Sequence, residues 1–183
     1  MSRVPRIALV LLFLSGADLM AQAPKGGEFS ATASINTPNG TRSLAFNLVV
    51  SNPITIEQAQ PLREVLARGG QQMLLSVIRD SRHGRIMFGG LEYPANLIVA
   101  ESDGGGMRYF VVTGRPIKWE ESANGEPSLD YPFTLLIVHA PEWGTGDGTI
   151  LTKAALYVDD EGHVRAEQYQ GEPGTLKDVK RLK

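Results

Sequence analysis

The stretch from Asp130 to Gln170 constrains the fold more than any other part of the chain. Tyr131 to Ala140 is an almost unbroken apolar run, and two further segments follow it, Gly148 to Val158 and His163 to Gln170. Turn-forming residues separate the three segments. Short runs rich in Phe, Leu, Ile and Val form strands more readily than helices. The stretch therefore predicts an antiparallel meander whose first strand is covered on both faces.

A β-hairpin is predicted nearer the N-terminus. Phe29 to Ile35 alternates apolar and polar residues, as a half-buried strand does. Pro38-Asn39-Gly40-Thr41 then contains the Asn-Gly pair that type I′ turns favour. A two-residue loop there pairs apolar residues on one face, namely Ile35 with Leu44, Ala33 with Phe46, Ala31 with Leu48 and Phe29 with Val50.

Other turns and runs complete the predicted sheet. A three-residue loop, Asp160-Glu161-Gly162, with Gly162 in the left-handed region, pairs Val158 with Val164 and Leu156 with Ala166. Glu120 to Asp130 is the longest polar loop and a candidate mobile segment. Three more strands are expected: His83 to Phe88, Ala95 to Glu101 and Met107 to Ile117. Ser102 to Gly106 forms the loose hairpin tip between the last two.

One region has helical periodicity. Thr55-x-x-Gln58 has the form of a capping box, but Pro61 would remove an interior hydrogen bond from a helix that begins there. We therefore expect an irregular turn and a regular helix from Pro61. Gly69-Gly70 separates two apolar stripes, Leu62, Val65 and Leu66 before it and Leu74, Val77 and Ile78 after it. The whole pattern predicts an α+β fold, a curved antiparallel sheet of about eight strands that can close partly into a barrel, with one helical hairpin packed on it.

The N-terminus has the layout of an export signal. Two arginines precede the apolar run Ile7 to Leu14, which is shorter than the roughly 20 apolar residues that a membrane span needs. A cut after Ala23 would place Pro24 beside the scissile bond, so we expect the cut after Ala21. The predicted organisation is a signal peptide (1–21), a flexible lead (22–28) and a single α+β domain (29–183). The mature chain would have no membrane span and would lie in the periplasm or outside a bacterial cell.

Composition excludes several function classes. The 183 residues include no cysteine, which rules out disulfides, thiolate metal sites and a cysteine nucleophile. The formal net charge is −2, and no Lys/Arg cluster forms the basic patch that a nucleic-acid-binding surface requires. We therefore expect no nucleic-acid partner.

The search for chemistry finds no catalytic motif. His83, His139 and His163 are far apart, without a second ligand at metal-binding spacing on one helix. His139 is in phase with the apolar residues of its strand, which favours a hydrogen-bonded histidine at a strand end over a catalytic base. Asp159-Asp160-Glu161-Gly162 lacks the alternating ligands of a calcium loop and is better explained as a hairpin turn. We predict no catalytic residue, no metal and no cofactor.

Several short motifs occur along the chain besides the signal, the Asn-Gly hairpin and the Gly69-Gly70 break. They are Arg115-Pro116-Ile117, Asp130-Tyr131-Pro132-Phe133-Thr134, Gly146-x-Gly148-Thr149-Ile150-Leu151 and Gly171-Glu172-Pro173-x-x-Leu176-Lys177. With these motifs the chain resembles a group of small exported bacterial proteins of unknown function, and the resemblance covers nearly the whole mature chain. The group has no assigned catalytic residues, so the resemblance implies no site.

Two functions are compatible with this pattern. The first is non-catalytic binding of a small apolar ligand, an envelope component or a protein partner, because a curved sheet closed by a helix pair commonly encloses a cleft. The second is a small periplasmic hydrolase in which His139 or His163 acts with a loop carboxylate. Ligand retention would support the first, and ester or glycoside turnover lost in His139→Ala would support the second.

One end of the sheet is the predicted ligand site. If Met107 to Ile117 pairs antiparallel with Tyr131 to Ala140, Trp119 and Tyr131 fall at the same end. Arg115 would add a positive charge beside these two aromatic rings, which suits an anionic or planar apolar group. The alternative is that Trp119 and Tyr131 only cap the core beneath the polar loop.

Overall fold

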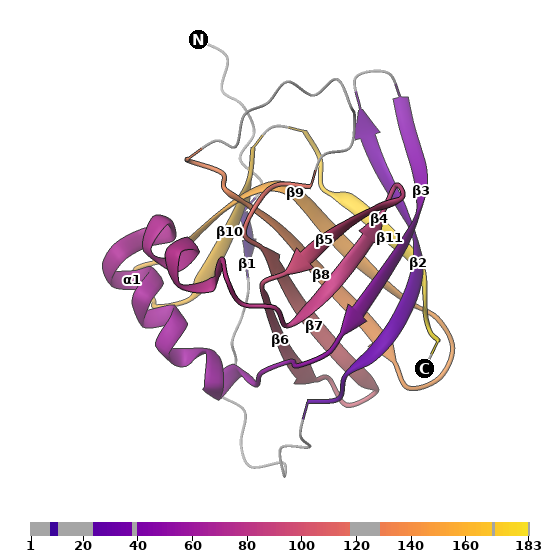
Figure 1. Cartoon of the computed structure of the whole chain (residues 1–183), viewed down its shortest axis with the longest axis horizontal. Helices are drawn as coiled ribbons and strands as arrows, with labels where there is room; N and C mark the ends of the chain where they lie inside the picture. Colours follow the sequence, from indigo (N-terminus) through magenta and orange to yellow (C-terminus); the bar gives the residue numbers. More distant parts are fainter. Residues whose placement is uncertain (1–7, 11–23, 38–39, 118–128, 170, 183) are drawn as a thin grey trace.

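The computed structural model describes residues 8–10, 24–37, 40–117, 129–169 and 171–182. Within these residues the fold is α+β, with a strongly curved sheet flanked by a single helix (Figure 1). The helix, α1, spans Ile56–Ile78. The strands are β1 (Ala8–Val10), β2 (Gly27–Thr37), β3 (Gly40–Val50), β4 (Gly84–Phe88), β5 (Leu91–Ala95), β6 (Leu97–Ser102), β7 (Gly106–Thr113), β8 (Phe133–Pro141), β9 (Gly146–Val158), β10 (Val164–Gln168) and β11 (Gly174–Arg181).

The sheet consists of two antiparallel meanders joined by the C-terminal strand. Its order is β5-β4-β3-β2-β11-β9-β8-β7-β6, and β10 pairs with the second half of β9. β11 lies between β2 and β9 and pairs antiparallel with both. Around Asp178, at φ 54, both of its ladders shift register, between Lys177 and Lys180 on the β2 side and between Leu176 and Val179 on the β9 side. Such a bulge increases local bending, which helps the sheet to curl into a nearly closed barrel.

The sheet separates two apolar cores. Inside the barrel, large side chains from β2 to β9 and from β11 fill the interior, among them Phe29, Leu48, Tyr109, Leu136 and Leu176. On the outer face, a second cluster packs between β6–β10 and α1. β8 contributes to both, with Leu136 and Val138 inside and Phe133 and Leu135 outside. The predicted central strand with two covered faces is confirmed.

A buried asparagine forms the corner where the barrel approaches closure. Asn96 lies between β5 and β6, and its side-chain NH2 donates to the carbonyls of Arg79 (2.8 Å) and Ser81 (3.0 Å). Its Oδ1 accepts from the backbone N–H of Gly114 at 2.6 Å. The polar atoms of this buried amide are therefore satisfied, and they join the end of α1 to the chain that leaves β7.

The helix begins earlier than predicted. Thr55 is the N-cap of a complete capping box with Gln58, so the expectation that a regular helix starts only at Pro61 is wrong. Pro61 and Glu57 are both exposed, so water can bond to the carbonyl that lacks a donor. The predicted break is present at Gly70, where φ is 67 and ψ is −173. α1 is thus a kinked helix, and its second part buries Leu74 and Ile78 but leaves Val77 exposed, contrary to the predicted stripe.

The first hairpin has a different register from the predicted one. Ile35 is opposite Arg42, Ala33 opposite Leu44 and Phe29 opposite Leu48, a shift of two residues. The predicted turn residues Pro38 and Asn39 lie outside the described residues, and Gly40 is the first residue of β3 at φ 110. Because side chains alternate with a period of two, this shift keeps the same residues on the same face.

The register of the second predicted hairpin is confirmed. Val158 pairs with Val164 and Leu156 with Ala166, and Gly162 has φ +82. The other predicted strands are present, but β7 ends at Thr113 rather than Ile117, and β1, β5 and β11 were not predicted. The part of the chain that the structure describes contains no helix long and apolar enough to cross a membrane.

Candidate functional site

An apolar groove lies between α1 and the outer face of the sheet. Its volume is ≈ 70 Å³. The helix α1 forms one wall, mostly through its part before Gly70, and β6, β7, β8, β9 and β10 form the other. The apolar residues lining it are Ile56, Ala59, Leu62, Leu66 and Leu74 from α1, and Leu97, Val99, Phe110, Val112, Leu135, Leu156 and Val164 from the sheet.

The helix supplies the two polar side chains of the groove. Gln60 is exposed, Arg63 is partly exposed, and Arg63 Nη1 donates to Gln60 Oε1 at 3.2 Å. Arg63 also lies against the β9–β10 turn, because a Cβ placed on Gly162 would be 3.1 Å from Arg63 Nη2. One rim of the apolar groove is therefore polar and adjoins this turn.

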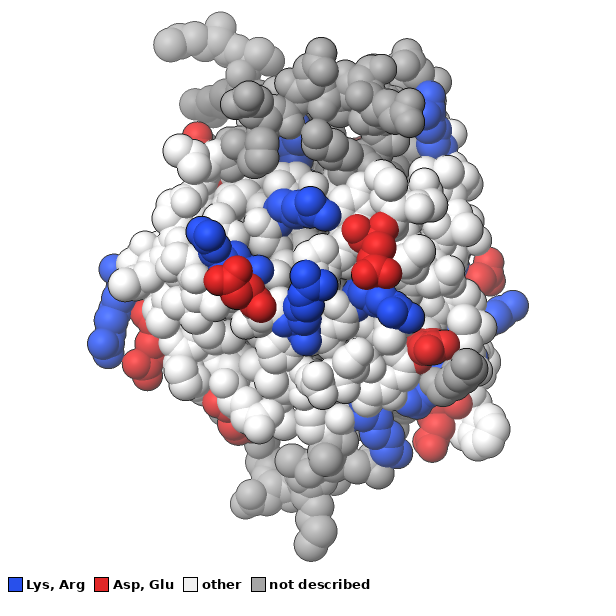
Figure 2. All heavy atoms as spheres, viewed as in Figure 1, with Lys and Arg blue, Asp and Glu red and all other residues white. Residues whose placement is uncertain are grey.

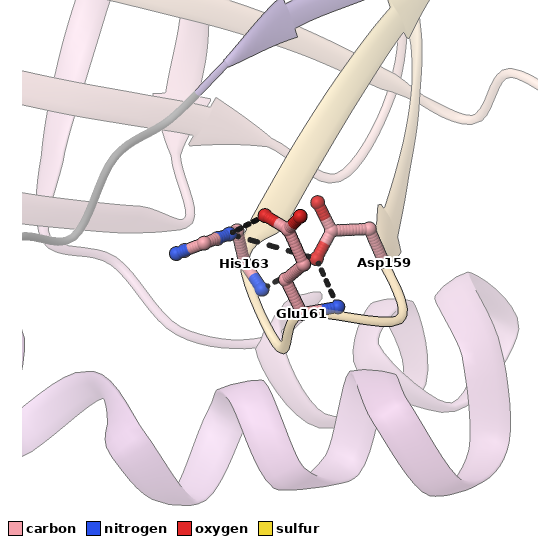
Figure 3. A group of neighbouring side chains, drawn as sticks. All are labelled: Asp159, Glu161 and His163. Atoms are coloured by element: carbon pink, nitrogen blue, oxygen red, sulfur yellow. Dashed lines mark hydrogen bonds and ion pairs between the residues drawn. The ribbon is translucent and has the colours of Figure 1, made fainter.

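The β9–β10 turn gathers one histidine and two acidic side chains (Figure 3). Asp159 Oδ1 accepts from the backbone N–H groups of Glu161 (3.1 Å) and His163 (2.8 Å). Arg165 Nε donates to Asp159 Oδ2 at 2.5 Å. His163 Nδ1 lies 3.3 Å from Glu161 Oε2 and 3.7 Å from Asp159 Oδ1.

Competing effects act on the Asp159 carboxyl. Desolvation raises its pKa, but the hydrogen bond from the His163 N–H and the hydrogen bond and charge of Arg165 outweigh it, so the net pKa is lowered. The carboxylate form is thus the one that the turn stabilises.

The same three side chains could be considered as metal ligands. One donor atom from each of Asp159, Glu161 and His163 lies within 4.8 Å of the others. However, Asp159 already accepts two backbone hydrogen bonds and pairs with Arg165, whose charge would repel a cation. The donor set therefore fits an ordered hairpin turn better than a metal centre.

His139 belongs to a row of charged residues on the outer face, beyond the end covered by α1. The row crosses four strands and reads Glu101, Arg108, His139 and Asp147. Arg108 Nη1 contacts Glu101 Oε1 at 3.0 Å, and His139 Nε2 contacts Asp103 Oδ2 at 2.6 Å. His139 Nδ1 lies 4.0 Å from Asp147 Oδ1. Since both ring nitrogens face carboxylates, the geometry is that of a paired histidine at a strand end.

The predicted ligand residues lie with separate partners. The Arg115 guanidinium is 5.4 Å from the centroid of the Tyr93 ring. Tyr131 packs against Tyr169, with centroids 4.9 Å apart, and its hydroxyl donates to Glu167 at 3.2 Å. Trp119 lies outside the described residues. The predicted antiparallel pairing of β7 with β8 is present, but Arg115 and Tyr131 contact different rings.

A second hollow, more polar than the groove, lies at the Gly104–Gly106 tip. Its volume is ≈ 210 Å³, and Lys25, Glu142 and Arg181 contribute to its walls. Arg181 already donates to the Gly26 carbonyl and lies over the Phe29 ring, 5.6 Å from its centroid. Elsewhere, described charges of both signs are interspersed on the face shown in Figure 2. The largely polar walls define the hollow less well as a site for an apolar ligand than the almost wholly apolar walls define the groove.

Sequence reasoning did not find the groove. The signal that locates its first wall is the capping box Thr55-x-x-Gln58, because a helix starting at Ile56 adds Ile56 and Ala59 to the stripe of Leu62 and Leu66. Because Pro61 indicates that the regular helix starts later, the sequence alone does not assign the first wall of the groove to this helix.

The fold and the groove define an α+β domain with a barrel-like antiparallel sheet and an apolar space beneath its helix. No protein-family model matches the chain, and no curated protein or solved structure is significantly similar to it.

Proposed function

We propose that the chain is an exported, non-catalytic binding domain that holds a small apolar ligand in the groove beneath α1. The observation that carries this proposal is the groove itself, whose walls are apolar except for Gln60 and Arg63. Binding sites for small molecules typically combine such walls with a few polar groups. The barrel interior is a weaker candidate, because side chains with little or no solvent exposure occupy it.

The size of the groove restricts the ligand. A cavity of about 150 Å³ can hold benzene, whereas this groove measures ≈ 70 Å³. The part of the ligand that enters is therefore a short alkyl group, with the rest of the molecule outside. An envelope component or a protein partner that inserts one apolar side chain would meet the same requirement.

Ligand retention and a blocking variant test the proposal. Native mass spectrometry of the exported protein should detect a bound small molecule, and Ala59→Phe should abolish it by filling the groove. Ala67→Phe is the matched control, because Ala67 is exposed on the same helix and does not line the groove. Equal retention by Ala59→Phe, or no retained or added alkyl compound bound by the wild type, would contradict the proposal.

The export part of the proposal has its own test. It is supported by the two arginines, the apolar run Ile7 to Leu14 and the Ala21-Gln22-Ala23 segment. N-terminal sequencing of exported material should find Gln22 first. A start before Ile7, or protein retained in the membrane fraction, would contradict export.

A hydrolase is the second candidate, because the 2.6 Å contact between His139 and Asp103 is a histidine–carboxylate pair. Among the described residues no serine or threonine hydroxyl is hydrogen-bonded to His139, so this pair lacks the nucleophile of a triad. Turnover of a generic ester or glycoside panel that is lost in His139→Ala would favour the hydrolase over the binding domain.

A further inference from the structure

The outer edge of β10 is paired with a segment from the far N-terminus (Figure 1). β1 runs antiparallel to β10, with Ala8 opposite Glu167, Leu9 opposite Ala166 and Val10 opposite Arg165. The other edge of β10 is occupied by β9. β1 lies within the predicted signal peptide, so a chain cut after Ala21 would lose this pairing.

The backbone direction of β10 shows which groups its outer edge would offer. Tyr169 N–H donates to the Lys153 carbonyl, and the His163 carbonyl accepts from Asp159 N–H, both at 2.9 Å. Odd-numbered residues of this strand therefore bond to β9, and even-numbered residues direct their N–H and C=O groups to the opposite edge. Removal of β1 would leave the backbone groups of Ala166 at an open sheet edge.

The edge does not have the usual protection against strand addition. Natural edges are commonly guarded by unpaired charges, prolines or bulges. In β10 the charged side chains are engaged elsewhere, Arg165 with Asp159 and Glu167 with the Tyr131 hydroxyl. Ala166, at the centre of the edge, is buried in the apolar cluster beneath α1.

We propose that the β10 edge of the mature chain is a docking site for an extended apolar segment of another polypeptide, which adds as an antiparallel strand in the place of β1. Main-chain hydrogen bonds supply affinity in this mode of recognition, and alternate side chains supply specificity. The residue opposite Ala166 would face the same side of the sheet as Ala166. That side carries the apolar layer beneath α1, which is why the docked segment is apolar. The Ala-Leu-Val sequence of residues 8–10 is the model for this segment.

A labelled peptide tests the site independently of export and of the groove. The protein is produced directly as residues 22–183, and the probe is a fluorescein-labelled peptide of residues 6–12 with added lysines for solubility. Saturable binding measured by fluorescence anisotropy is expected. N-methylation at Leu9, whose N–H is directed at Ala166, should weaken binding about tenfold or more through loss of backbone bonding. N-methylation at Val10, whose N–H is directed away, is the matched control and should change the affinity less than about twofold.

Location and occupant are checked in the same experiment. Hydrogen exchange of the Ala166 amide should slow when the peptide is bound. No saturable binding, equal loss with both methylated peptides, or unchanged Ala166 exchange would overturn the proposal. A mature chain that dimerises through β10 and excludes the peptide would also overturn it, because the occupant would then be a second copy. Retention of an apolar small molecule in the groove is measured separately. Failure to detect a retained molecule would therefore neither support nor contradict peptide docking at β10.

Discussion

Single residues in the β9–β10 turn determine how this hairpin closes. Gly162 has a left-handed backbone at φ +82, which a β-branched residue adopts poorly. Gly162→Val should therefore lower the free energy of unfolding by about 1 kcal/mol or more, measured by urea denaturation. Gly105→Val is the control, since Gly105 lies in open space at another hairpin tip and is not left-handed. An unchanged midpoint for Gly162→Val would contradict the turn.

Asp159 makes the same turn sensitive to pH. Its pKa is lowered from 3.8 because the His163 N–H and Arg165 outweigh the opposing effect of desolvation. Because the pKa of Asp159 is lower in the folded protein than in the unfolded chain, its ionisation stabilises the fold at pH values above the unfolded pKa of about 3.8. This contribution is lost as the pH falls from about 3.8 through the lower folded-state pKa.

Asp159→Asn tests this linkage. The variant should be less stable than wild type at neutral pH, and the difference should shrink as the pH falls below about 3.8. Chemical denaturation over a pH series measures it, with Asp160→Asn, exposed in the same turn, as the control. A stability difference that does not vary with pH would mean that the ionisation of Asp159 is not coupled to folding.

At the scale of elements, α1 depends on Gly70 to change direction. Its φ of 67 and ψ of −173 lie in a region that is essentially restricted to glycine. Just after it, Gln71 Nε2 donates to the Asp130 carbonyl at 2.7 Å, and Gln71 Oε1 accepts from Leu156 N–H at 3.3 Å. The second part of the helix is thereby bonded to β9 and to the segment before β8.

Gly70→Ala should disturb this arrangement. The expected loss in the free energy of unfolding is about 1–3 kcal/mol, the usual strain for a non-glycine residue in this region. Thermal denaturation compares it with Gly105→Ala, where neither a contact within 4 Å nor a left-handed backbone opposes the added methyl. Equal melting temperatures for the two variants would show that the kink tolerates a side chain.

At the scale of the whole molecule, β11 holds the two meanders together, because it pairs with β2 of the first and with β9 of the second. Leu176 of β11 is 1% exposed and packs inside the barrel where β11 meets β2 and β9. Leu176→Ala should therefore reduce the free energy of unfolding by about 2–5 kcal/mol through the cavity it leaves. Its neighbour Thr175 is exposed, so Thr175→Ala should have little effect. Similar denaturation curves for both variants would contradict the position of β11.

Local patterns predicted much of this fold, and the unpredicted parts depend on distant contacts. The meander from Tyr131 onward was predictable because its apolar runs and the left-handed Gly162 agree on one register. β11 was not predicted, because Gly174–Arg181 contains four charged residues and is a strand only between β2 and β9. Hydrophobic pattern also could not decide the β2–β3 register, since a two-residue shift preserves both faces.

The candidate site was less predictable than the fold. Its walls come from α1 and five strands, and no short motif joins them. The sequence predicts that Arg115 and Tyr131 share one end of the sheet, because the strands beside them pair antiparallel. That reasoning places residues along a sheet but does not say which rings they contact.

The position of ligand binding is the central claim, and methyl NMR during titration with 1-hexanol tests it most directly. The account predicts concentration-dependent shifts for the methyl groups of Leu62, Leu66 and Val99, which line the groove, and none for Leu48 and Leu176 inside the barrel. Ala59→Phe should suppress the shifts. Shifts confined to the barrel interior, or no shifts at all, would contradict a binding groove beneath α1.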